Sequence, residues 1–209
     1  MTLHYLIRPA PSPDADGGTL LLLHGRGADE YDLMPLAEGL PEWLTVVTVR
    51  APRALHPGYQ WYEMEALGVP EASSFAAALA YVAEAWHRLA EHGPALARPW
   101  FLGGFSQGAL MAVAAAMGQT GVDPAGVVAL SGYLPDTVPA RRALTGLPIF
   151  WGHGLNDPVL PFAWGEQAAR RLKELGAAVE FRSYAAAHAV TAEEVRDLRA
   201  WLERVRAKR

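Results

Sequence analysis

The sequence predicts an α/β fold in which a mostly parallel β-sheet has helices packed on both faces. Short apolar runs alternate along the chain with segments of helical periodicity, and this alternation is typical of such folds. Several runs are apolar at nearly every position, which indicates central strands covered on both sides. The expected strands are residues 19–24, 44–50, 99–105, 125–131, 147–151 and 178–184, and residues 4–8 are expected to add an edge strand, about seven in all.

Helices can be located between these strands by their apolar spacing. Apolar residues over 75–89 recur every three or four positions, which predicts a helix ending near residue 93. The same spacing over 195–205 predicts a C-terminal helix, and Thr191 followed by Glu194 has the pattern of its capping box. In a sheet of this kind, functional sites lie beyond the carboxyl ends of the strands. We therefore look for chemistry just after each apolar run.

Composition excludes several classes of protein. The 209 residues, 51% hydrophobic and 19% charged, suit one globular domain over residues 1–209. The formal net charge of −4 argues against nucleic acid or an anionic membrane surface as partner, because both favour a basic face. The chain has no cysteine, so disulfides, thiolate nucleophiles and cysteine-based metal sites are excluded.

The N-terminal sequence and the apolar runs bear on the cellular location of the protein. No basic segment followed by a long apolar run is found at the N-terminus, and the aliphatic block 20–23 is far too short to span a bilayer. We expect a cytoplasmic protein without stable membrane insertion.

The motif that carries most information is Gly-Phe-Ser-Gln-Gly at residues 104–108. It follows an expected strand and precedes a helical segment over 109–117, the order that a nucleophile elbow requires. In such an elbow a strained turn lifts the serine hydroxyl clear of the sheet, and we expect the glycines because side chains there would collide with the serine. The N-terminus of the next helix offers N–H groups to an oxyanion. The motif predicts the α/β-hydrolase fold with Ser106 as nucleophile.

A serine nucleophile needs a base, and the base needs an acid that orients it. In this fold the acid and then the histidine follow the serine along the chain, each on a loop after a later strand. Asp157 and His188 follow the last two expected strands, so we expect Ser106, Asp157 and His188 to form a catalytic triad. His153 is the alternative base, although it precedes the acid, and Asp136, one strand earlier, is the alternative acid.

An oxyanion hole needs two N–H donors. The residue after the nucleophile, Gln107, supplies one. Residues 24–29, His-Gly-Arg-Gly-Ala-Asp, directly follow the first buried strand, and their glycines let the backbone approach a substrate carbonyl. We assign the second donor to the backbone N–H of Arg26. The alternative is a glycine turn before a helix that begins near Asp29.

The longest connection, residues 51–72, is too short for a large cap domain. Its aromatic residues include Trp61 and Tyr62. They are expected either to line a substrate pocket as a small apolar lip or to pack onto the core.

Four blocks together resemble the phospholipase/carboxylesterase family, which includes acyl-protein thioesterases and small bacterial carboxylesterases. The blocks are residues 24–29, 103–108 and 152–157, and Tyr184 with His188. The resemblance runs from about residue 19 to the end of the chain. It implies Ser106, Asp157 and His188 as the triad, with Arg26 and Gln107 as oxyanion donors.

Three residues depart from the family pattern. Ala189 stands where a serine or threonine is common, Arg26 where the thioesterase branch prefers leucine, and Glu63 where a block usually ends in aspartate. These differences favour a broad-specificity carboxylesterase over an acyl-protein thioesterase.

We therefore expect a serine carboxylesterase that cleaves esters with short to medium acyl chains through an acyl-enzyme and needs no metal or organic cofactor. Its partner is expected to be a small-molecule ester or thioester, and the sequence leaves a homodimer open. The alternatives are an acyl-protein thioesterase or a lysophospholipase. A serine peptidase would carry a gating domain, a dienelactone hydrolase would use cysteine, and a non-catalytic binding module would have lost a triad residue.

Overall fold

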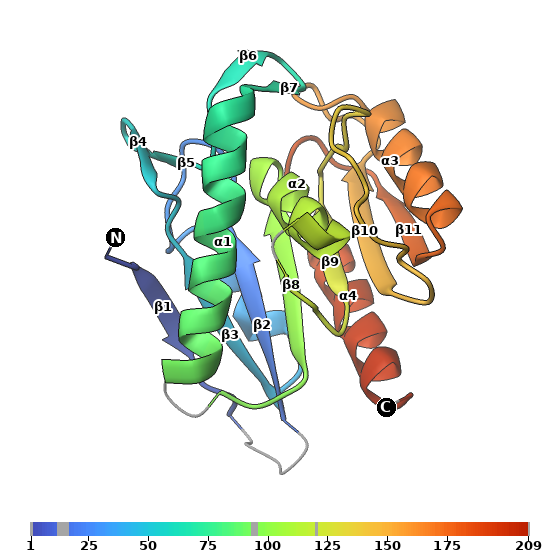
Figure 1. Cartoon of the computed structure of the whole chain (residues 1–209). Coiled ribbons are helices and arrows are strands. Elements are labelled where there is room, and N and C mark those ends of the chain that lie inside the picture. The colour runs from blue at the N-terminus through green and yellow to red at the C-terminus, as the bar shows by residue number, and fades with distance from the viewer. Residues whose placement is uncertain (1, 12–16, 93–95, 120, 209) are drawn as a thin grey trace.

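The computed structural model describes residues 2–11, 17–92, 96–119 and 121–208, and its centre is a seven-stranded sheet (Figure 1). The strand order is β1-β3-β2-β8-β9-β10-β11. Neighbouring strands are parallel except β1, which pairs antiparallel with β3 at one edge. The strands are β1 (Tyr5–Arg8), β2 (Gly18–Leu23), β3 (Leu44–Val49), β8 (Trp100–Phe105), β9 (Val127–Leu130), β10 (Pro148–Gly154) and β11 (Ala178–Tyr184). The predicted fold class is confirmed, and each expected strand is present.

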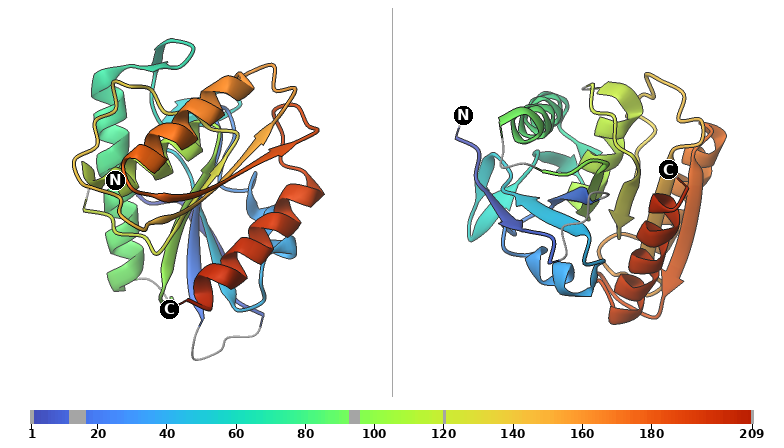
Figure 2. Two further views of the ribbon diagram at one scale, coloured as in Figure 1. Left: turned by 90° about the vertical axis from the view of Figure 1, so that its right-hand side faces the viewer. Right: turned by 90° about the horizontal axis from the view of Figure 1, so that it is seen from below.

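Helices cover both faces of the sheet (Figure 2). One face carries α1 (Ala72–His92), α2 (Gln107–Ala114) with its π-helical extension η2 (Ala115–Gln119), and α3 (Phe162–Glu174). The other face carries α4 (Ala192–Arg206) and the short 3-10 helix η1 (Met34–Gly39).

The strand β2 shows why this arrangement follows from the sequence. Leu21 and Leu23 point into the core beneath α1 and α2, whereas Leu20 and Leu22 point into the core beneath α4 and η1. A strand that alternates between two cores must be apolar at every position. All four leucines are at most 1% exposed.

The connection between β3 and α1 folds into two small hairpins, not a cap. They are β4 (Arg53–Leu55) with β5 (Gly58–Gln60), and β6 (Met64–Ala66) with β7 (Val69–Pro70). Figure 1 shows the second hairpin above the first turn of α1. Trp61 and Tyr62, between the hairpins, are completely buried.

Two expected boundaries need correction. No α-helix begins at Asp29, whose side chain instead accepts a hydrogen bond from the Tyr31 N–H in a local turn (2.9 Å), and η1 starts only at Met34. β10 continues through Gly154, because its pairing with β11 extends to the Gly154–Tyr184 pair. The helix α1 ends at His92, in agreement with the expected end near Gly93, which itself lies outside the described residues.

Candidate active site

Ser106 occupies a sharp turn between β8 and α2. Its backbone has φ 54° and ψ −115°, a conformation that residues with a side chain rarely adopt. Such strain costs about 1–3 kcal/mol and persists only where the surroundings impose it. The Ser106 N–H donates to the Leu130 carbonyl (2.9 Å), which ties the turn to the end of β9. The partly exposed serine thus lies at the carboxyl edge of the sheet.

The glycines around Ser106 are required for a different reason from the one expected. A Cβ at Gly104 would overlap the backbone of Gly108, and a Cβ at Gly108 would overlap the carbonyl of Leu23. The collisions are therefore with neighbouring backbone, not with the serine. Because α2 starts directly against the end of β2, the turn has no room for side chains at these positions.

The loops after β10 and β11 bring Asp157 and His188 together. The His188 Nδ1 donates to Asp157 Oδ2 at 2.7 Å. Asp157 Oδ1 accepts two further hydrogen bonds, from the N–H groups of Val159 (2.8 Å) and Leu160 (2.9 Å). The Asp157 side chain is fully buried, whereas that of His188 is 16% exposed. This geometry holds the proton on Nδ1 and leaves Nε2 as the basic nitrogen of the neutral ring.

His153 lies beneath this pair and is completely buried. Its Nε2 donates to the Leu160 carbonyl (3.0 Å) and lies 3.5 Å from Asp157 Oδ2. Burial is the main cause of a lowered pKa, so the ring is neutral near pH 7. His153 therefore supports the loop that carries Asp157. Asp136, the alternative acid, is exposed on the loop after β9, and the carboxylate bonded to His188 is that of Asp157.

The loop of residues 24–29 packs against Ser106. A Cβ at Gly25 would lie 3.1 Å from the Phe105 ring and 3.6 Å from the Ser106 Cβ. The buried His24 ring fixes this loop: its Nδ1 donates to the Gly25 carbonyl (2.7 Å), and its Nε2 accepts the Ala51 N–H (3.0 Å). Burial lowers the pKa of His24, which keeps this neutral tautomer.

The backbone N–H of Arg26 is directed by the same contact. The Gly25 carbonyl and the Arg26 N–H belong to one trans peptide unit and point in opposite directions. By holding the carbonyl, His24 fixes the direction of the N–H. Over the described ranges, neither the Arg26 N–H nor the Gln107 N–H donates to a backbone acceptor.

The Gln107 side chain has a role that sequence reasoning missed. Its Oε1 accepts the Trp61 N–H and its Nε2 donates to the Tyr62 carbonyl, each at 2.8 Å. The Trp61 indole N–H in turn donates to the His24 carbonyl (2.8 Å), and the Tyr62 hydroxyl bonds to that of Tyr133 (2.8 Å). In the motif Gly-x-Ser-x-Gly this position is variable, so no sequence signal identifies the contact.

The same contacts bear on the pocket role expected for Trp61 and Tyr62. Both side chains are 0% exposed. Of the two alternatives for this segment, the structure therefore shows packing onto the core at these two positions. Their function is to anchor the elbow and the loop of residues 24–29.

Among the cavities formed by the described residues, two adjoin loops at the sheet edge that carries Ser106. One, of about 200 Å³, lies between the β6–β7 hairpin and the start of α3, with an apolar lining that includes Leu67, Val69, Tyr133, Leu134 and Trp164. The other, of about 260 Å³, borders the His188 ring and is lined by Asp32, Leu33, Leu36, Phe105, His188, Ala189 and Val190.

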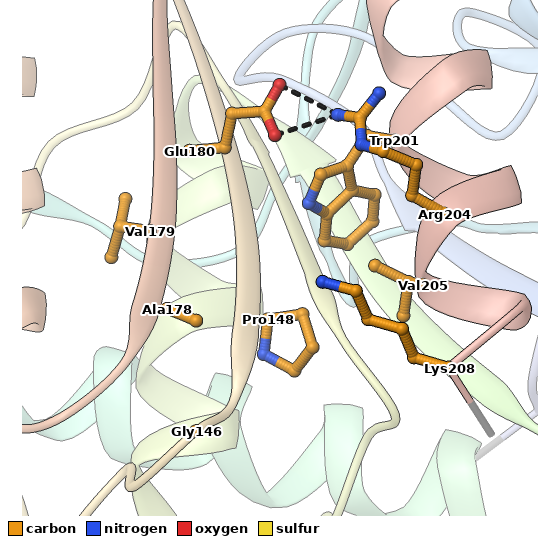
Figure 3. Close-up of a pocket in the computed structure, with 9 residues that line it drawn as sticks. All are labelled: Gly146, Pro148, Ala178, Val179, Glu180, Trp201, Arg204, Val205 and Lys208. Carbon is orange, nitrogen blue, oxygen red and sulfur yellow. Dashed lines mark hydrogen bonds and ion pairs between the residues drawn. The ribbon is translucent and has the colours of Figure 1, made fainter.

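A larger cavity, of about 570 Å³, lies at the opposite edge (Figure 3). It adjoins Pro148 and Ala178, the first residues of β10 and β11, and is crossed by the ion pair between Arg204 and Glu180 (2.8 Å). Since it lies at the amino ends of the strands, it is remote from the candidate triad.

The described residues contain no group of three or more histidine, aspartate or glutamate side chains that could hold a metal ion. Likewise, none of the helices described is sufficiently long and apolar to cross a membrane.

Comparison with known proteins identifies relatives over nearly the whole chain. The model of the phospholipase/carboxylesterase family matches residues 10–206. An acyl-protein thioesterase 1 of Cryptococcus neoformans is 27% identical over 90% of this chain and 92% of its own. The acyl-protein thioesterase 1 of Debaryomyces hansenii is 36% identical over 113 residues, and that match spans only 48% of the yeast protein. The crystal structure of a carboxylesterase from Mesorhizobium loti superposes with a TM-score of 0.83 at 25% identity, covering 95% of this chain and 93% of that one. The chain belongs to the phospholipase/carboxylesterase family.

Proposed function

We propose that this protein is a serine hydrolase that cleaves carboxylic esters through Ser106, His188 and Asp157. The observation that carries the proposal is a strained, partly exposed serine at the same edge of the sheet as a histidine whose Nδ1 bonds to a buried carboxylate at 2.7 Å. The carboxylesterase of Mesorhizobium loti, a structural neighbour, supports the reaction class.

The chemistry follows from these groups. The Ser106 oxygen attacks the acyl carbonyl while His188 Nε2 accepts the hydroxyl proton. The negative charge that develops on the carbonyl oxygen is stabilised by the N–H groups of Arg26 and Gln107. The intermediate then collapses, and His188 returns the proton to the leaving alcohol. Water, activated by His188, attacks the acyl-enzyme and releases the acid and Ser106.

Asp157 holds the imidazole in the required tautomer and stabilises the imidazolium as it forms. Its two hydrogen bonds from Val159 and Leu160 keep Oδ2 directed at His188. Because the carboxylate is buried, its attraction for the imidazolium is weakly screened by solvent.

The apolar cavity between the β6–β7 hairpin and the start of α3 is the proposed acyl site. Tyr133, in its lining, comes three residues after Leu130, whose carbonyl holds the Ser106 backbone. A volume of about 200 Å³ suits a short or medium acyl chain better than a long one.

Thioester or lysophospholipid cleavage is the second candidate. It would use the same groups, and the relatives named acyl-protein thioesterase support it. Rates on matched oxygen and thioesters of equal chain length would separate the two.

The test is hydrolysis of p-nitrophenyl esters of graded chain length, together with labelling by a fluorophosphonate probe. Ser106→Ala and His188→Ala should each lose about 10⁴- to 10⁶-fold in kcat. His153→Ala should lose less, because its ring only supports the Asp157 loop. Near-normal turnover by folded Ser106→Ala protein, or a greater loss from His153→Ala than from His188→Ala, would overturn the assignment.

The cytoplasmic location, the single domain over residues 1–209 and the homodimer that the sequence leaves open stay predictions.

A further inference from the structure

The cavity beside His188 occupies the position that a leaving group requires. In the proposed mechanism, His188 Nε2 gives its proton to the departing oxygen, so the alcohol part of the ester must lie against the imidazole. The His188 ring packs on Phe105 with a centroid distance of 4.7 Å, and both rings border the cavity. A leaving group would therefore enter this space of about 260 Å³.

The lining combines apolar walls with one carboxylate. Leu33, Leu36, Phe105 and Val190 supply the walls, and Asp32 supplies the charge. In the part of the chain that the structure describes, the Asp32 side chain takes part in no hydrogen bond or ion pair. Burial is the main cause that raises the pKa of Asp32; the His24 ring lowers it and the nearby Asp29 carboxylate raises it further.

Three basic side chains in and near the loop of residues 24–29 do not pair with Asp32. Arg26 Nε donates to the Gln60 Oε1 at 3.1 Å, on the side of the β4–β5 hairpin. Arg50 forms a bidentate ion pair with the Glu30 carboxylate. His24 is buried and neutral. Of the two carboxylates here, Asp32 lines the cavity, whereas the nearby Asp29 is not in the lining and accepts the Tyr31 N–H.

We propose that this cavity is a leaving-group subsite that selects esters of cationic alcohols, with Asp32 as counter-charge to an alkylated ammonium group. The proposal rests on the proposed esterase function. An alkylated ammonium suits the lining, because its carbon atoms contact Leu36 and Val190 while its charge faces the carboxylate. An anionic leaving group would be repelled, and a neutral one would gain nothing from Asp32.

The test compares two isosteric substrates, butyrylcholine and 3,3-dimethylbutyl butyrate, which differ in the charge of the leaving group. For the wild-type protein, kcat/KM should favour the choline ester by about three- to tenfold, the effect of one partly exposed charge at close range. Asp32→Asn should abolish most of this preference. The matched control, Asp136→Asn, removes the same charge from the exposed loop after β9 and should keep it. Salt at 0.5 M should weaken the preference in the wild-type protein.

A second measurement separates failure of the subsite from failure of the esterase function. Choline is titrated into Ser106→Ala protein, and the His188 ring resonances are followed by NMR. Shifts that disappear in Ser106→Ala/Asp32→Asn protein support the subsite even if neither ester is hydrolysed, and hydrolysis of the p-nitrophenyl esters tests the esterase function separately. The subsite is refuted if the wild-type protein hydrolyses both esters equally, if Asp32→Asn and Asp136→Asn change the preference alike, or if choline does not perturb His188.

Discussion

Glu194 lies in the first turn of α4 and is 1% exposed, so its carboxyl group is expected to make stability depend on pH. Its Oε1 lies against Gly152 of β10 and has no hydrogen-bond partner among the described residues. Burial is the main cause that raises the pKa of Glu194 to about 7. A hydrogen bond from the Thr191 N–H to the carboxyl group partly offsets this effect. Replacement by glutamine keeps the shape of the side chain and removes the ionisation.

The sign and size of the effect follow from linkage. Below pH 4.5 the carboxyl is protonated in both the folded and unfolded protein and costs nothing. As pH rises from 4.5 towards 7, the unfolded chain loses the proton while the folded protein retains it, so the free energy of unfolding decreases. Above pH 7 the loss is constant, and a shift of this size corresponds to about 3 kcal/mol.

Urea unfolding of the wild-type protein and Glu194→Gln between pH 4.5 and 9 measures the effect. The stability gained by the variant should be about 0.5 kcal/mol or less at pH 4.5 and grow to about 3 kcal/mol at pH 9. Glu193→Gln, at the exposed neighbouring position on the same helix, is the matched control and should show no such growth. A difference between wild-type protein and Glu194→Gln that stays constant over this range would refute the reasoning.

Two further predictions concern the groups around Ser106. Gln107→Ala leaves the buried Trp61 N–H and Tyr62 carbonyl without partners, so urea unfolding should show a loss of about 2–4 kcal/mol; wild-type stability would show that these contacts are unimportant. Arg26→Leu should keep most of kcat on a neutral aryl acetate, because the backbone N–H survives, whereas Arg26→Pro should lose roughly 10²- to 10³-fold. Equal damage from leucine and proline in proteins of unchanged melting temperature would mean that the guanidinium, not the N–H, acts in catalysis.

The fold class could be predicted because its determinants are local and repeated. Each central strand is apolar at nearly every position, since both faces of the sheet are covered, and this pattern is visible in any short window. The capping box of α4 is equally local, and the Glu194 N–H does donate to the Thr191 hydroxyl (3.1 Å). The start of η1 was mispredicted because Asp29 is as suitable for a turn as for a helix N-cap.

The candidate site also has features that the sequence predicts and features that only the structure shows. The sequence by itself determined which residue types follow which strands, and hence that Ser106, Asp157 and His188 should meet at one edge. Only the tertiary structure decided that the Asp157 carboxylate bonds to His188 while His153 lies buried beneath it.

The remaining features depend on contacts between residues far apart in the chain. The Gln107 side chain forms hydrogen bonds with a backbone segment about 45 positions away. The carbonyl at the end of β2 leaves no room for a side chain at Gly108. The Glu194 side chain of α4 packs against Gly152 of β10. No periodicity or motif encodes such pairs, because each depends on how side chains from separate elements fill a shared volume. The sequence therefore determines the strands, the turns and the order of the reactive groups, whereas packing decides which polar groups are buried, paired or left to meet a ligand.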